Sequence, residues 1–150
     1  MSQESSQECR NQAIRLLSRR EHSRKELQHK LYGKGFEDGL VSDLLDALEK
    51  ERLLSDARYA EAYIFSRSQK GYGPQRIQRE LGERGVDEGM VSRLLSDMDV
   101  DWMEIAARVR KKKFGSGVPD RWEDKARQIR FLQYRGFTQE QINRALTENG

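Results

Sequence analysis

Apolar residues recur at helical spacing along this chain, in short segments separated by glycines. The clearest stretch runs from residue 55 to residue 86. Its first part opens with a Ser-Asp pair that is typical of a helix start, and apolar residues follow at helical spacing. A turn that contains two glycines interrupts it, and a second helix begins at Pro74 and ends at Gly85. The pattern predicts two helices joined by a tight turn.

The same arrangement of apolar residues and glycines occurs three times. A shift of 50 residues aligns the first copy with the second, and a further shift of 51 aligns the second with the third. The aligned positions include Leu31, Leu81 and Leu132; Gly35, Gly85 and Gly136; Phe36, Val86 and Phe137; and Val41, Val91 and Ile142. Self-similarity at a fixed period is the signature of a repeat protein.

Each aligned glycine stands where a helix should end and the backbone should turn left-handed, a conformation that glycine adopts at little cost. The leucine four positions before it and the apolar residue directly after it are the two positions that meet in a Schellman ending. The residue after the glycine is also spaced to staple onto the next helix. We therefore expect the second and third helices of every repeat to form a fixed corner.

A first helix completes each repeat, at about residues 5–20, 55–70 and 101–114. Each repeat is then a three-helix bundle that is too small to be stable alone and depends on its neighbours. The predicted fold class is all-α and elongated, with three tandem three-helix repeats at residues 1–54, 55–100 and 101–150. The third copy departs most, because Gln128 stands where the other copies have Leu27 and Ile77.

Composition fits folded helices with much surface. Of 150 residues, 35% are hydrophobic and 35% are charged. The net charge is only +3 and the apolar residues are periodic, which argues against disorder. The single cysteine, Cys9, excludes an internal disulfide framework, and no apolar run approaches the length of a membrane span. We therefore expect a cytoplasmic protein that does not contact a membrane.

Basic residues are concentrated in the last third of the chain. Between Arg108 and Arg135 there are ten basic residues and three acidic ones. A second basic set surrounds Tyr72, a loop residue that either stacks on a partner or packs within the protein. Such cations indicate a surface for phosphate groups or for an acidic protein. The lysines at 111–113 equally suit the end of a helix, whose dipole favours cations.

The residues that catalysis or metal binding would need are few. One cysteine and two histidines cannot form a structural zinc site, and we interpret His22 and His29 as a surface pair. No glycine-rich loop has phosphate-binding spacing, because the glycines beside Tyr72 belong to a helix-start turn. No catalytic histidine can be assigned to Cys9 from its position. We predict no enzymatic activity, no metal and no cofactor.

Several of these residues together resemble the signature of the RecX family of regulatory proteins. The middle repeat carries Asp56-x-x-Tyr59-Ala60, Arg67, Gly71, Gly73-Pro74-x-x-Ile77, Glu80-Leu81 and Gly85-Val86. The first repeat contributes the run from Leu16 to Leu27, and the third contributes Lys112-Lys113-Phe114, Lys125 and the run from Arg130 to Phe137. The match covers nearly the whole chain.

The resemblance implies a curved, elongated monomer that lodges in the groove of the RecA recombinase filament on DNA. There it represses ATP hydrolysis, strand exchange and LexA-type co-protease activity in the SOS response, with some affinity for single- and double-stranded DNA itself. Contacts to RecA or DNA are expected from Arg67, Lys70, Arg76, Lys111, Lys113, Arg121, Lys125, Arg127, Arg130 and Arg135. Two alternatives stay open: a helical-repeat DNA-binding module that acts without RecA, and an adaptor without effect on RecA.

Overall fold

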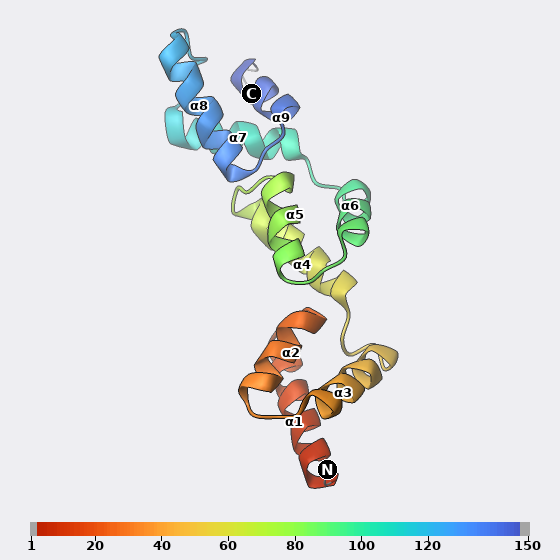
Figure 1. The fold of residues 1–150 in the computed structure, drawn as a ribbon. Coiled ribbons are helices and arrows are strands. Elements are labelled where there is room, and N and C mark those ends of the chain that lie inside the picture. The colour runs from red at the N-terminus through yellow and green to blue at the C-terminus, as the bar shows by residue number, and fades with distance from the viewer. Residues whose placement is uncertain (1–2, 148–150) are drawn as a thin grey trace. The chain divides into compact units, whose positions relative to one another are not determined.

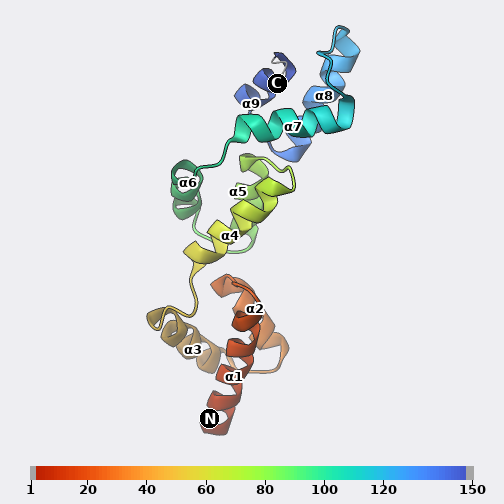
Figure 2. The same cartoon turned by 180° about the vertical axis from the view of Figure 1, so that it is seen from behind.

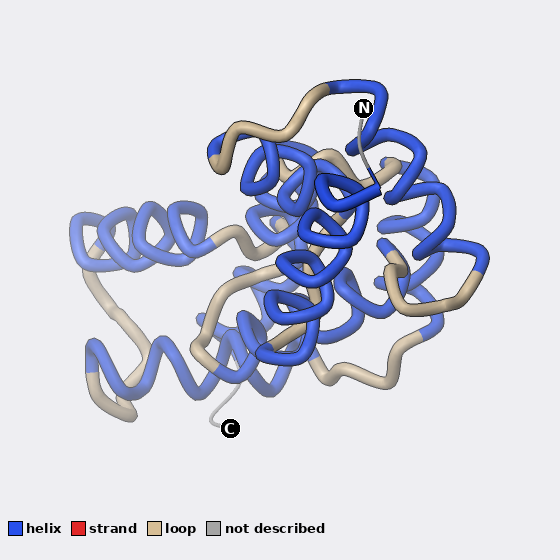
Figure 3. Tube along the Cα trace, turned by 90° about the horizontal axis from the view of Figure 1, so that it is seen from below, coloured by secondary structure: helices blue, strands red, loops and turns tan. Residues whose placement is uncertain are grey.

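The computed structural model describes residues 3–147 of the chain. Over this range the chain forms nine α-helices joined by loops and contains no strand (Figures 1 and 3). The helices are α1 (Gln3–Arg19), α2 (Arg24–Gly33), α3 (Asp38–Lys50), α4 (Asp56–Gln69), α5 (Pro74–Glu83), α6 (Glu88–Asp97), α7 (Trp102–Phe114), α8 (Trp122–Arg135) and α9 (Gln139–Thr147). This confirms the predicted all-α fold class.

The helices pack in groups of neighbours. Helices α1, α2 and α3 contact one another, and so do α7, α8 and α9 (Figure 2). The chain divides into two compact units: the first unit comprises residues up to Ala62 together with Leu81–Val91, and the second unit comprises Tyr63–Glu80 together with the residues from Ser92 onward. Helices α4, α5 and α6 therefore each contribute residues to both units.

The three predicted corners are present. Gly35, Gly85 and Gly136 have φ values of 92°, 81° and 97°, in the left-handed region. After each glycine, the next residue donates its backbone N–H to the carbonyl oxygen of a buried leucine, at 3.3, 3.1 and 3.1 Å respectively. The accepting leucines are Leu31, Leu81 and Leu132. These are the long-range bonds of a Schellman motif, so the corner predicted from the repeat is confirmed.

The aligned apolar positions form the cores of the two units. The buried cluster of the first unit comprises Cys9, Ala13, Leu27, Leu31, Val41, Leu45, Leu48 and Leu54. The buried cluster of the second unit comprises Ile105, Ala106, Leu132, Phe137, Ile142, Ala145 and Leu146. Each cluster draws on three helices, because one helix alone has nothing on which to bury its apolar stripe. Burial raises the pKa of the Cys9 thiol, as suits a core residue rather than a nucleophile.

His22 is buried, which corrects its interpretation as one of two surface histidines. The residue is 1% exposed, whereas His29 is exposed. Its Nδ1 lies 3.0 Å from the carbonyl oxygen of Arg20, and its Nε2 lies 2.8 Å from Nζ of Lys30. A lysine ammonium only donates, so Nε2 accepts and the neutral ring carries its proton on Nδ1. Burial is the main cause that lowers the pKa of His22.

We expect acid to destabilise the protein through His22. Because the folded-state pKa lies below the ordinary value of 6.5, the unfolded chain takes up the proton first. The stability contributed by the neutral ring is fully present above the unfolded-state pKa of 6.5. It is lost as the pH falls from there toward the folded-state pKa. Urea denaturation between about pH 8 and about pH 5 should show the wild type losing free energy of unfolding relative to His22→Gln. Parallel pH profiles would contradict this.

The third repeat has a polar pair in its core. Arg110 is fully buried, and its Nη1 donates to the Gly117 carbonyl at 3.0 Å and to Oε1 of Gln128 at 3.4 Å. Its Nε and Nη2 have no partner among the residues described. Gln128 is buried too, at the repeat position of two fully buried apolar residues, Leu27 and Ile77. This corrects the placing of Arg110 among the surface cations.

Replacing the polar pair by apolar residues should stabilise the protein. A buried guanidinium without a carboxylate partner retains much of its desolvation cost, so the double variant Arg110→Met, Gln128→Leu should gain about 1–4 kcal/mol in free energy of unfolding. Arg110→Met alone leaves the buried amide of Gln128 without its donor and should gain less. Urea denaturation of both variants measures the difference. A double variant less stable than the wild type would show that the pair is a net stabilising element.

Backbone hydrogen bonds join the α4–α5 turn to the α8–α9 corner in the second unit. The N–H of Gly73 donates to the carbonyl of Arg135 at 2.7 Å, and the N–H of Gln75 donates to the carbonyl of Gly136 at 2.9 Å. A Cβ on Gly73 would lie 2.4 Å from the carbonyl carbon of Gly136, and a Cβ on Gly136 would lie 2.3 Å from Cβ of Arg76. Both positions therefore require glycine. We call this contact the glycine junction.

The first unit repeats the same contact with different chemistry. The Oγ of Ser23 donates to the carbonyl of Arg84 at 2.9 Å, and a Cβ on Gly85 would lie 2.7 Å from Cβ of Lys25. The repeat alignment makes Ser23 equivalent to Gly73, and Gly85 equivalent to Gly136. Successive repeats are therefore joined in one way: the corner of one repeat lies against the start of the second helix of the repeat before it.

The glycine junction can be tested by adding a single methyl group. Gly73→Ala should lower the free energy of unfolding by about 2 kcal/mol or more, because the new Cβ meets backbone that cannot rotate away. Gly82→Ala is the matched control, since Gly82 lies within α5 with no atom within 4 Å of an added Cβ. It should raise stability by up to about 1 kcal/mol through helix propensity. Thermal denaturation compares the two, and equal melting temperatures would refute the junction.

Candidate functional site

Three arginines of the second unit surround the ring of Tyr72. The guanidinium carbons of Arg67, Arg76 and Arg135 lie 3.9, 4.6 and 4.8 Å from the ring centroid. They come from α4, α5 and α8, so this tyrosine cluster gathers helices from two repeats. Each such cation–π contact is worth about 0.5–2 kcal/mol. Tyr72 thus packs within the protein, which decides between the two roles considered for it.

Glu80 neutralises part of the tyrosine cluster. Its carboxylate accepts from Arg67 at 3.0 and 3.1 Å, from Arg76 at 3.2 Å and from the hydroxyl of Tyr63 at 2.8 Å. Partial burial raises the pKa of Glu80, but the hydrogen bonds from these three side chains outweigh it and hold the pKa below its usual value. The side chains of Arg67 and Arg76 are only 21% and 18% exposed. These two arginines are therefore committed largely to internal contacts.

A pocket with a volume of about 270 Å³ lies beside the tyrosine cluster; we call it the cationic pocket. Its lining residues are Lys70, Val109, Lys112, Lys113, Phe131 and Arg135. Arg135 connects it to the cluster, because its Nη1 donates to the carbonyl of Lys70 at 3.3 Å while its guanidinium carbon lies 5.4 Å from the Phe131 ring centroid. Nζ of Lys113 lies 5.5 Å from the same centroid. Among the residues that the structure describes, no carboxylate lines this pocket.

Lys111 lies elsewhere. It lines a second pocket, on another face of α7, together with Arg108 and Arg144. Two carboxylates, those of Asp101 and Glu104, line the same pocket and offset two of its three positive charges. The three consecutive lysines of α7 are therefore divided between two sites of different electrostatic character.

The remaining predicted residues lie on or next to α8. Lys125 and Arg130 are exposed. Nη2 of Arg127 is 3.3 Å from a carboxylate oxygen of Asp124, and its guanidinium carbon lies 5.8 Å from the ring centroid of Phe114. Arg121 is exposed too and pairs loosely with Glu123 at 3.9 Å. Five of the ten predicted cations thus converge on the tyrosine cluster and the cationic pocket: Arg67, Lys70, Arg76, Lys113 and Arg135.

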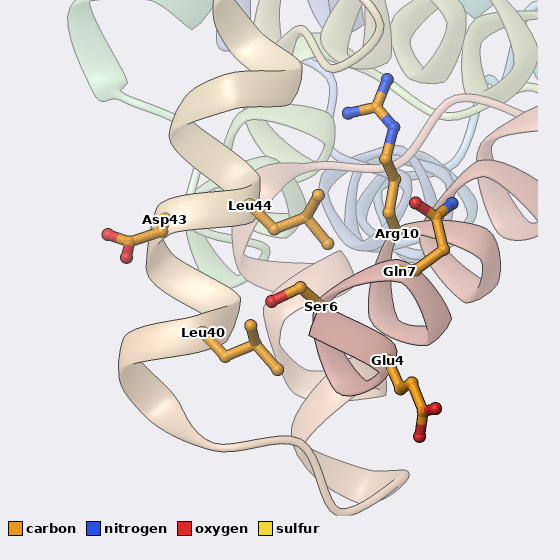
Figure 4. Close-up of a pocket in the computed structure, with 7 residues that line it drawn as sticks. All are labelled: Glu4, Ser6, Gln7, Arg10, Leu40, Asp43 and Leu44. Atoms are coloured by element: carbon orange, nitrogen blue, oxygen red, sulfur yellow. The ribbon is translucent and has the colours of Figure 1, made fainter. Parts of the chain in front are cut away.

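The first unit contains a larger pocket, of about 680 Å³, between α1 and α3 (Figure 4). In Figure 4 the side chains of Leu40 and Leu44 point toward Ser6, whereas Asp43 points away from them. Arg10 is turned toward Glu51, to which it donates at 2.8 and 3.0 Å. The charged groups do not converge, so this pocket does not assemble acid–base chemistry.

The residues that the structure describes contain no group of three or more histidine, cysteine, aspartate or glutamate side chains placed to hold a metal ion. Among their helices, none has the length and apolar character that crossing a membrane requires.

Comparison with known families accounts for the repeat. Three family models match in succession: the first three-helix domain of RecX at residues 9–48, the second at 55–95 and the third at 99–146. The chain belongs to the RecX family. The resemblance drawn from the sequence motifs is thereby confirmed, and so is the arrangement as tandem three-helix repeats.

Relatives in the family carry the name Regulatory protein RecX. The one from Halorhodospira halophila is 46% identical over 140 residues, which is 93% of this chain and 87% of that protein. The one from Pseudomonas entomophila is 46% identical over 138 residues, 92% of this chain and 89% of that protein. The crystal structure of RecX from Lactobacillus salivarius shares the fold, with a TM-score of 0.84, 22% identity and 97% of both chains covered.

Sequence reasoning missed two parts of this RecX surface. The predicted contact set lacks Lys112, which lines the cationic pocket. Its spacing from Val109 places Val109, Lys112 and Lys113 on one side of α7, and this spacing is visible in the sequence. The role of Glu80 was also missed. Its pairing with Arg76 is a local contact at four residues, but its pairing with Arg67 crosses from α5 to α4. Only the packed helices show the second contact.

Proposed function

We propose that this protein binds the filament that RecA forms on DNA and represses its ATP hydrolysis, strand exchange and co-protease activity. The observation that carries the proposal is the match of all three RecX domains, in order, along the chain. The name of its relatives, regulatory protein, supports a role in controlling another protein. The protein would act in the cytoplasm as a monomer, in the regulation of DNA repair and the SOS response.

The proposed effect is one of binding and needs no catalytic residue. A filament exchanges between states that hydrolyse ATP well and poorly, and a ligand shifts that balance only by binding one state more tightly. A protein that prefers the poorly hydrolysing state, or that hastens disassembly, lowers turnover without chemistry of its own. The expectation of a non-enzymatic regulator follows from this mechanism.

The second unit is the proposed contact region. It holds all ten cations of the predicted contact set, and complementary charge chiefly sets the rate and orientation of association. Within that set, Lys125 and Arg130 are exposed, and Arg127 is mostly exposed at 63% of its side chain. These three are better placed to reach an acidic RecA surface or DNA phosphates than Arg67 and Arg76, which Glu80 holds.

Reversing three charges on α8 should remove the inhibition. In an assay of DNA-stimulated ATP hydrolysis by the cognate RecA, substoichiometric wild-type protein should lower the rate. The triple variant Lys125→Glu, Arg127→Glu, Arg130→Glu should need at least about tenfold more protein for the same effect, because it presents negative charge to an acidic surface. The matched control carries the same charge change on exposed cations of the first unit: Arg15→Glu, Arg19→Glu and Lys34→Glu. It should inhibit like the wild type.

The outcomes of this assay test the proposed function and the proposed contact surface separately. If wild-type protein leaves the rate of ATP hydrolysis unchanged under conditions where RecA filaments form, the proposed function is contradicted. Inhibition that survives in the triple variant would exclude only the α8 surface as the contact. Tight duplex binding with a steep salt dependence but no effect on RecA would favour the alternative, a DNA-binding module.

A further inference from the structure

We propose that the cationic pocket of the second unit binds a phosphate group of a nucleic-acid strand. The proposal rests on the proposed function, because it names the ligand of one site within the proposed contact region. It moves the phosphate contact from the exposed cations of α8 to a recess formed by three helix ends.

The charge of the pocket exceeds what the local structure requires. Lys70 directly follows α4, Lys112 and Lys113 lie in the last turn of α7, and Arg135 ends α8. Each helix C-terminus carries roughly half a negative charge, so three such ends amount to about −1.5. Four cations against this leave about +2.5, and no carboxylate of the described part of the chain lines the pocket to reduce it. Helix dipoles alone therefore do not explain why these cations meet.

The pocket is built by contacts that do not depend on its lysines. The glycine junction fixes the end of α8 against the α4–α5 turn. Gly71 is close to α7, because an added Cβ would lie 2.7 Å from Cγ2 of Val109. On the other wall, the rings of Phe114 and Phe131 meet edge to face with centroids 5.4 Å apart. The backbone segments that carry the cations are therefore fixed before a ligand binds, which favours affinity.

The side chains favour phosphate over carboxylate. A carboxylate is best bound by the free fork of an arginine. Arg135 offers its fork only in part, because its Nη1 already donates to the Lys70 carbonyl while its guanidinium stacks against Tyr72 and Phe131. The other cations are lysines, whose ammonium groups act as point charges and can surround the several oxygens of a phosphate.

The size of the pocket points to one group rather than a whole nucleotide. Ligand pockets commonly measure about 300–1,000 Å³. At about 270 Å³ this one is smaller, and the Phe131 ring is already flanked by Phe114, Lys113 and Arg135, which leaves it poorly placed to stack on a base. Binding of this kind positions a strand by its backbone and carries no sequence preference.

Two double variants with equal charge loss test the site. The pocket variant is Lys70→Gln, Lys112→Gln, and the control is Arg15→Gln, Arg19→Gln, which removes two exposed cations of the first unit. The probe is a fluorescein-labelled single-stranded thymidine oligonucleotide, and anisotropy titrations at several salt concentrations give its affinity. The pocket variant should bind about tenfold or more weakly, with a salt slope reduced by about 0.7–1, as loss of one phosphate contact predicts. The control should change affinity by less than about threefold.

Several results would overturn the site. Equal losses in both variants would mean diffuse attraction, and no loss in either would exclude a phosphate contact. A loss of binding to a labelled polyglutamate peptide, with oligonucleotide binding intact, would assign the pocket to an acidic protein. If inorganic phosphate binding, measured by calorimetry, depended on these lysines and oligonucleotide binding did not, the ligand would be free phosphate. Unchanged melting temperatures of both variants would show that they fold.

The same variants separate this site from the proposed function. Suppose that wild-type protein leaves RecA turnover unchanged but the pocket variant loses oligonucleotide binding. The proposed function would then be refuted and the phosphate site supported. If instead wild-type protein inhibits RecA and the pocket variant binds the oligonucleotide normally, the phosphate site would be refuted and the proposed function supported.

Discussion

The glycine junction is the constraint on which the site of the second unit depends. Its two backbone hydrogen bonds require the α4–α5 turn to lie directly against the end of α8, and no side chain fits between Gly73 and Gly136. That approach brings Arg135 onto the ring of Tyr72 and within reach of the Lys70 carbonyl. A spacer of one methyl group would separate these groups, because the opposing atoms belong to backbone and cannot rotate away. The tyrosine cluster and the cationic pocket therefore both depend on close packing at the glycine junction.

The repeats share one architecture and differ in what they carry. Corner glycines, buried leucines and the contact between successive repeats recur with little change, as expected where each small bundle must be completed by its neighbour. The third repeat breaks the pattern in its core, where Arg110 and Gln128 are buried, and on its surface, where seven of the ten predicted contact cations lie. The repeated corners and buried leucines stabilise the fold. The cations on the surface are the groups proposed to bind RecA and DNA.

The sequence located the predicted contact cations along the chain but could not sort them into separate sites. Lys111, Lys112 and Lys113 are adjacent, yet a helix turns by about 100° per residue, so three successive side chains cannot all share one face. One of them meets the carboxylates of Asp101 and Glu104, and the other two meet Lys70 and Arg135. Local spacing could group Lys112 with Lys113 and Val109. It could not add two residues that lie on other helices.

The sequence by itself determined the helices, their corners and the family, because these depend on contacts between residues a few positions apart. A glycine after a leucine at a set spacing ends a helix wherever it occurs, and three copies of that ending define the fold. Tertiary structure alone decided which charges are buried and which meet. Arg110 meets Gln128 of another helix, and Lys70 meets cations of α7 and α8 that are distant from it in sequence. Periodicity reports which side of a helix is apolar, but not which neighbouring helix covers it.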